Sequence, residues 1–136
     1  MMSVNLFAVV VAALASVGVG FLWYHPRVFG TMWMRLTGLS PDVIERGKKH
    51  PLITTLAALG ASFLMAYTLS RFAFMWGVLT LTNALELAFW VWLGLVVPLL
   101  ISPVLWEGRP WKLFLLNAMY WFVTITLMSV IVGLWI

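Results

Sequence analysis

The fold is decided by residues 4–24, which read VNLFAVVVAALASVGVGFLWY and carry no charge. Two more stretches, 51–70 and 113–136, are also uncharged, and 83–105 holds one charged residue, Glu86. About 20 helical residues cross a hydrocarbon core of roughly 30 Å, and a helix satisfies its own backbone hydrogen bonds in lipid. The sequence therefore predicts an all-α, polytopic membrane protein with four transmembrane helices, at about 4–24, 51–71, 83–105 and 113–136.

The composition leaves no space for a soluble domain. Of 136 residues, 64% are hydrophobic and 9% are charged, which predicts a single transmembrane domain over residues 1–136. The first apolar stretch lacks the basic flank and the small-residue cleavage site of a signal peptide, so we expect this helix to be retained. The chain has no cysteine, which excludes disulfides and thiol chemistry.

Basic residues are distributed unevenly among the connections. Five lie between the first and second helices and two between the third and fourth, whereas the second connection has only Arg71. Because cytoplasmic loops are enriched in Lys and Arg, the first and third connections are predicted to be cytoplasmic and both termini external. The net charge of +4 then indicates orientation and contact with anionic membrane lipid, and we expect no nucleic acid as a partner.

The connection between the first two spans contains an expected helix of its own. Apolar residues recur there at helical spacing, namely Phe29, Met32, Trp33, Leu36 and Leu39. We expect an interfacial amphipathic helix with its aromatic face toward the acyl chains. Gly38 can end this helix, and Ser40-Pro41 is typical of a new helix start. The segment either fixes the geometry of the helical hairpin or offers a docking surface to a partner.

Small residues recur every four positions on the first two spans. The first has Ala8, Ala12, Ser16 and Gly20, and the second has Ala58, Ser62, Ala66 and Ser70. Helices in lipid associate where small side chains let their backbones approach closely. The two stripes therefore predict the tightest helix pair of the bundle. In the third span, Pro98 predicts a kink.

Glu86 is the acid within an apolar span and is the first candidate for a functional role. An ionised side chain in the membrane costs free energy, and such residues often mark solute, ion or proton paths. Asn83 lies about one turn away and is a candidate for the same site. The alternative is structural, because an acid near the start of a helix can cap it or pair with Arg71.

Further candidate polar groups lie in and before the fourth span. Asn117 and Tyr120 share a helix face with Thr124, and we expect them either to hydrogen-bond between helices or to line a polar path. Glu107 and Arg109 flank Gly108 in a tight turn, where the carboxylate can neutralise the guanidinium.

Motifs of catalysis and cofactor binding are missing from the sequence. It has no Ser-His-Asp set, no glycine-rich phosphate loop and no metalloprotease motif. His25 and His50 have no Asp or Glu placed at ligand spacing. We therefore expect no metal, no cofactor and no enzymatic activity.

Two segments resemble a known family. Trp23-Tyr24-His25-Pro26, followed by Phe29-Gly30 and Trp33-Met34, is similar to the signature after the first helix of the membrane family catalogued as domain of unknown function 1761. Glu107-Gly108-Arg109-Pro110, with Lys112 to Phe114, Asn117 and Tyr120, is similar to that family's second signature. The family commonly has serine where this chain has His25. The resemblance implies a small bacterial four-helix protein, and it brings no activity, substrate or catalytic residue.

Two functions of different classes fit these observations best. The small-residue stripes favour a structural or accessory component of the bacterial inner membrane, which assembles with itself or with another membrane protein. The alternative is a channel or transporter for a small solute or ion, with Glu86, Asn83 and Asn117 along its path. Because four short helices enclose little space, transport would require an oligomer.

Overall fold

The structure, a computed structural model, describes residues 4–135 and is helical, without strands, over this range. Four spans in it are long and apolar enough to cross a membrane. Their bounds are α1 (Leu6–Trp23), α4 (Pro51–Met75), the third span (Leu81–Glu107) and α7 (Trp111–Leu134). The predicted all-α membrane fold is confirmed, with helix ends shifted by a few residues. Ile136 of the predicted fourth helix lies outside the described residues.

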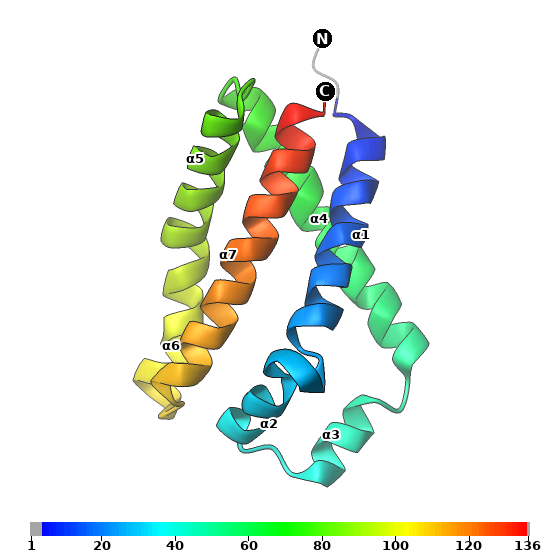
Figure 1. Cartoon of the computed structure of the whole chain (residues 1–136), viewed down its shortest axis with the longest axis vertical. Coiled ribbons are helices and arrows are strands. Elements are labelled where there is room, and N and C mark those ends of the chain that lie inside the picture. The colour runs from blue at the N-terminus through cyan, green and yellow to red at the C-terminus, as the bar shows by residue number, and fades with distance from the viewer. Residues whose placement is uncertain (1–3, 136) are drawn as a thin grey trace.

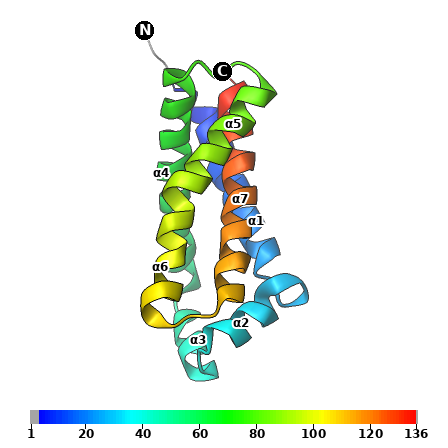
Figure 2. The same cartoon turned by 90° about the vertical axis from the view of Figure 1, so that its left-hand side faces the viewer.

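The spans run up and down, and α7 packs against α1, α4 and α5 (Figures 1 and 2). The start of α1 and the end of α7 lie side by side, where Nδ2 of Asn5 donates to the carbonyl oxygen of Trp135 at 3.3 Å. The connection from α4 to α5 lies at this end too, which we call the termini end. The opposite end carries the first and third connections and seven of the eight Lys and Arg residues, and we call it the basic end.

The pair α1 and α4 makes the most extensive helix contact, as the small-residue stripes predict. Oγ of Ser16 and Oγ of Ser62 lie 3.3 Å apart, and Ala12 and Ala66 are both fully buried. Gly20 differs from the prediction, because a Cβ at this position would lie 3.2 Å from the phenol oxygen of Tyr120 on α7. At this end of the stripe the direct contact is therefore with α7, and a cavity of about 250 Å³ separates Gly20 from Ala58 and Ser62 of α4.

The N-terminal half of α4 diverges from the bundle toward the basic end (Figure 1). None of residues 51–64 is buried, whereas Ala66, Leu69, Ser70 and Ala73 are. The apolar core accordingly fills the half of the bundle nearer the termini. Its buried members are Val9, Ala12, Ala66, Leu69, Ala88, Ile125, Met128 and Val132.

The third span is one helix interrupted by a π-helical turn. It consists of α5 (Leu81–Val91), η2 (Trp92–Val96) and α6 (Val97–Glu107). Pro98 has no backbone N–H, and its ring displaces the carbonyl one turn earlier. A π-helical turn just before a proline absorbs this mismatch. The π-helical turn η2 thus lies directly before Pro98, the residue at which the sequence predicts a kink.

The first connection begins with a second π-helical turn, η1 (Pro26–Gly30), followed by α2 (Thr31–Thr37) and α3 (Pro41–Gly47). Gly38 ends α2 with a φ of 67°, and Oγ of Ser40 accepts from the backbone N–H of Val43 at 3.3 Å, as predicted for a cap. Part of the aromatic face that was expected to lie against lipid packs against the protein itself. The rings of Phe29 and Trp23 lie 4.6 Å apart, so the start of this segment packs on the end of α1.

Candidate functional site

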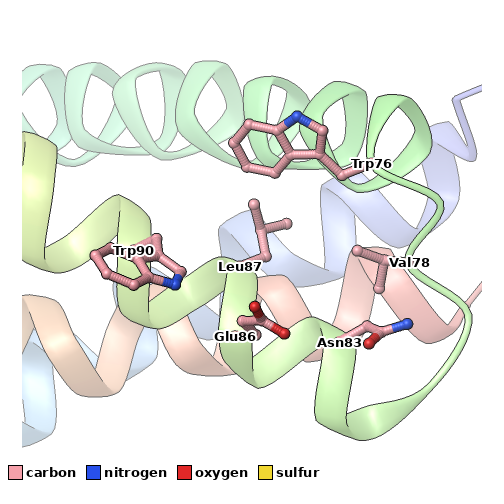
Figure 3. A pocket seen from close by; sticks show the side chains of 6 residues that line it. All are labelled: Trp76, Val78, Asn83, Glu86, Leu87 and Trp90. Carbon is pink, nitrogen blue, oxygen red and sulfur yellow. The ribbon is translucent and has the colours of Figure 1, made fainter.

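Glu86 and Asn83 line one pocket at the termini end, between α4 and α5 (Figure 3). Asn83, Glu86 and Trp90 lie on one face of α5, because positions i, i+3 and i+7 of a helix point in similar directions. Trp76, the C-cap residue of α4, borders the pocket from the other side. The cavity measures about 360 Å³ and is lined by Trp76, Val78, Asn83, Glu86, Leu87 and Trp90.

The structural alternatives expected for Glu86 are not observed. The cap of α5 is Thr80, whose Oγ1 accepts from the backbone N–H of Asn83 at 3.2 Å. Glu86 lies beyond the first turn of the helix, and no ion pair or hydrogen bond joins its carboxylate to Arg71 or any other residue between 4 and 135. Its side chain is exposed, so the carboxylate is open to whatever occupies the pocket.

Asn117 and Tyr120 belong to a separate polar cluster near the basic end. The phenol O–H of Tyr24 donates to Oδ1 of Asn117 at 2.6 Å, and the Tyr24 and Tyr120 rings lie 5.1 Å apart. Burial raises the pKa of Tyr24 above its ordinary range, and the neighbouring Tyr120 adds to this rise. Asn117 therefore makes the interhelical hydrogen bond that its position predicts. Its partner Tyr24 was not predictable from spacing along the chain, although Tyr24 lies in a segment that resembles the family.

Thr124 is not part of this hydrogen-bonded cluster. It is fully buried, and its Oγ1 has no hydrogen-bond partner within the described part of the chain. Of the three polar residues on this face, Asn117 therefore makes the hydrogen bond, Tyr120 contributes ring contacts, and Thr124 does neither. Its methyl group and its size suit the core position. Its hydroxyl, in contrast, makes no hydrogen bond that would offset the cost of removing it from water.

Arg109 ties the turn between α6 and α7 to the first connection. One of its guanidinium N–H groups, at Nη1, donates to the carbonyl oxygen of Thr37 at 3.0 Å, and Gly108 adopts a φ of 66° in the turn. No ion pair joins Glu107 to Arg109 in the range 4–135, so the expected neutralisation is not observed. Arg109 instead satisfies a carbonyl at the end of α2, where helices leave acceptors unpaired.

The two polar groups lie at opposite ends of the bundle. Glu86 is near the start of α5 at the termini end, while Asn117 lies in the first two turns of α7 from the basic end. The buried core, including Ile125 and Met128, occupies the bundle between them. Within a single chain, Glu86 and Asn117 therefore do not share a polar path.

A larger cavity of about 540 Å³ lies at the basic end. It is bordered by the end of α1, by η1 and α2, and by α3, and Tyr24, His25 and Lys48 contribute its polar groups. Sequence patterns could not predict this cavity, because its walls come from segments that meet only in the folded chain. No three His, Cys, Asp or Glu side chains gather as metal ligands in residues 4–135.

These features define a helical membrane protein with four apolar spans and separate polar groups at its two ends. The chain belongs to the family described as "Protein of unknown function (DUF1761)", whose model matches residues 7–133. The two segments that resemble this family meet in the structure, where Tyr24 contacts Asn117 and Tyr120. Comparison with curated proteins and with solved structures gave no match.

Proposed function

We propose that the protein is a self-assembling structural or accessory component of the bacterial cytoplasmic membrane, with both termini external. The observation that carries this proposal is an exposed small-residue face on the diverging half of α4. Ala57, Gly60 and Ala61 are all exposed, and a Cβ placed on Gly60 would meet no atom within 4 Å. This face lies roughly opposite Ser62 and Ala66, which pack toward the bundle.

Small residues on a lipid-facing helix surface permit close backbone approach by a second helix. Within the chain, the other small-residue face of α4 already packs closely against α1. The face at Ala57, Gly60 and Ala61 has no such neighbour between residues 4 and 135. A second copy supplies the same surface, and a two-fold axis beside α4 would pair the two faces symmetrically. The proposed assembly is therefore a dimer through the N-terminal halves of α4.

A Gly60→Leu substitution tests this contact, because the added side chain would hold the two α4 helices apart. Gly18→Leu on α1 is the matched control, since a Cβ there also meets no atom within 4 Å. Native mass spectrometry from lipid-retaining detergent should show a dimer for the wild type and for Gly18→Leu. It should show a monomer for Gly60→Leu. A wild-type monomer, or a Gly60→Leu dimer of unchanged abundance, contradicts the proposal.

A channel or transporter for a small solute or ion is the second candidate, and the exposed carboxylate of Glu86 favours it. Since the core separates Glu86 from Asn117, a path would have to follow an interface between copies. Glu86→Gln keeps the shape of the side chain and removes its charge. In reconstituted vesicles this change should lower flux if Glu86 serves transport, and absence of ion flux in the wild type would argue against this candidate.

A further inference from the structure

We propose that the pocket of Glu86, Asn83, Trp76 and Trp90 binds an organic ammonium group. This inference goes beyond assembly, because every residue of the pocket comes from one chain. It rests on the charge of the pocket, the chemistry of its walls and its depth along the span.

The charge of the pocket favours a cation. Glu86 supplies a carboxylate, and no basic residue in the range 4–135 forms an ion pair with it. A carboxylate in an apolar span is costly when it is left unpaired. The amide of Asn83 adds a second polar group at the same wall (Figure 3).

The aromatic walls select the kind of cation. Trp76 and Trp90 are 62% and 58% exposed, so a large part of each indole ring is available to a ligand, while Phe72 stacks on Trp76 with the ring centroids 5.4 Å apart. Tryptophan is the best aromatic partner for a cation, and quaternary ammonium groups are typically bound by such rings. Val78 and Leu87 add apolar surface that suits the methyl or methylene groups of an organic cation.

A divalent metal ion fits the pocket less well. Calcium takes six to eight oxygen ligands, and magnesium requires octahedral oxygen coordination. The pocket offers one carboxylate and one side-chain amide, within about 360 Å³ of space. That space is large for a bare ion and sufficient for an ammonium headgroup with its substituents.

The depth of Glu86 places the pocket near the lipid headgroups. The third span has 27 residues, so at 1.5 Å per residue it is about 40 Å long and exceeds a hydrocarbon core of roughly 30 Å. Glu86 follows Leu81 by five residues, about 7.5 Å along the helix axis. The ammonium group can therefore come from a lipid headgroup or from a free cation at the membrane surface.

Binding is tested with choline as the probe, on protein reconstituted in vesicles of phosphatidylglycerol, which has no ammonium group. Saturation-transfer nuclear magnetic resonance should detect choline, and dimethylbutanol, its uncharged carbon isostere, should bind much more weakly. Glu86→Gln should weaken choline binding about tenfold, the effect of losing one favourable charge contact in a partly wet site. Trp76→Leu and Trp90→Leu should each weaken it several-fold.

Glu107→Gln and Trp106→Leu are the matched controls, because both residues are exposed and lie at the basic end. Both should bind choline as the wild type does, and so should monomeric Gly60→Leu, which separates this inference from the proposed dimer. Equal binding by Glu86→Gln and Glu107→Gln, or equal binding of choline and dimethylbutanol, overturns the proposal.

The source of the ammonium group is identified by adding phosphatidylcholine to the vesicles. If the lipid headgroup occupies the pocket, wild-type choline binding should fall as the phosphatidylcholine fraction rises, and Glu86→Gln should show no such change. If free cations are the ligands, choline binding should not depend on this fraction.

Discussion

Tyr24 joins the end of α1 to α7 by one short hydrogen bond and one ring contact. Its phenol O–H donates to Asn117 at 2.6 Å, and its ring packs 5.1 Å from that of Tyr120. Both interactions favour the neutral phenol, because ionisation would remove the donated hydrogen and place a charge in a partly apolar site. The protonation state of Tyr24 is therefore coupled to the packing of the basic end.

We predict that Tyr24 ionises well above the ordinary tyrosine pKa of about 10, since burial raises its pKa and Tyr120 adds to the rise. The neutral phenol contributes its full stability below pH ~10. That contribution is lost as the pH rises from there through the folded-state pKa. Ultraviolet titration of tyrosinate, compared between wild type and Tyr24→Phe, isolates this group. A difference that titrates at the ordinary pKa contradicts the prediction.

The residues of the Glu86 pocket differ in how far the sequence could predict them. Glu86 and Asn83 were predictable, because a carboxylate within an apolar run is a local feature of the sequence. Trp76 and Trp90 were not, since the chain has nine tryptophans and only folding decides which of them meet at one pocket. Whether these residues act together in function stays a prediction.

At the scale of elements, hydropathy predicted the four spans but not all of their ends. The second helix was expected to end at about residue 71, near Arg71, whereas α4 continues to Met75. An exposed arginine close to a membrane surface can extend its charge toward water, so it does not have to end a helix. The N-terminal half of α4 was expected to pack on α1 along the whole small-residue stripe. The divergence of this half, on the N-terminal side of Ser62, was not predictable from local spacing.

The π-helical form of η1 and η2 was also not predictable from sequence patterns, although Pro98 indicated where the third span would depart from a regular helix. Hydrophobic periodicity does not distinguish one extra residue in a turn from a regular helix. In η1, Gly30 donates from its N–H to the carbonyl oxygen of His25 at 3.0 Å, and a Cβ on Gly30 would collide with the backbone carbonyl of Tyr24. Glycine suits this position because the π-helical turn itself brings residue 30 against the backbone of Tyr24 and His25, five to six residues earlier.

At the scale of the whole molecule, the termini and the basic connections lie at opposite ends of the bundle. This arrangement agrees with the up-and-down order of four spans. By the positive-inside rule, the excess of basic residues predicts that the basic end is cytoplasmic. The same prediction places the Glu86 pocket and the termini on the external side.

This orientation predicts the labelling of single cysteines, which can be introduced freely because the chain has none. In intact cells, a membrane-impermeant thiol reagent should label a cysteine on a C-terminal extension and spare Lys49→Cys. After permeabilisation both should react, which controls for accessibility. Labelling of Lys49→Cys from outside intact cells would reverse the assignment.

The proposed dimer is tested most directly by disulfide cross-linking in native membranes. A disulfide forms only where the two Cα atoms lie within about 7 Å, so it reports close helix contact. Single cysteines at positions 53 to 64 should cross-link with helical periodicity, with the highest yields at Ala57, Gly60 and Ala61. Gly18→Cys should remain monomeric. Equal yields around the helix, or no cross-link at any of these positions, would contradict assembly through α4.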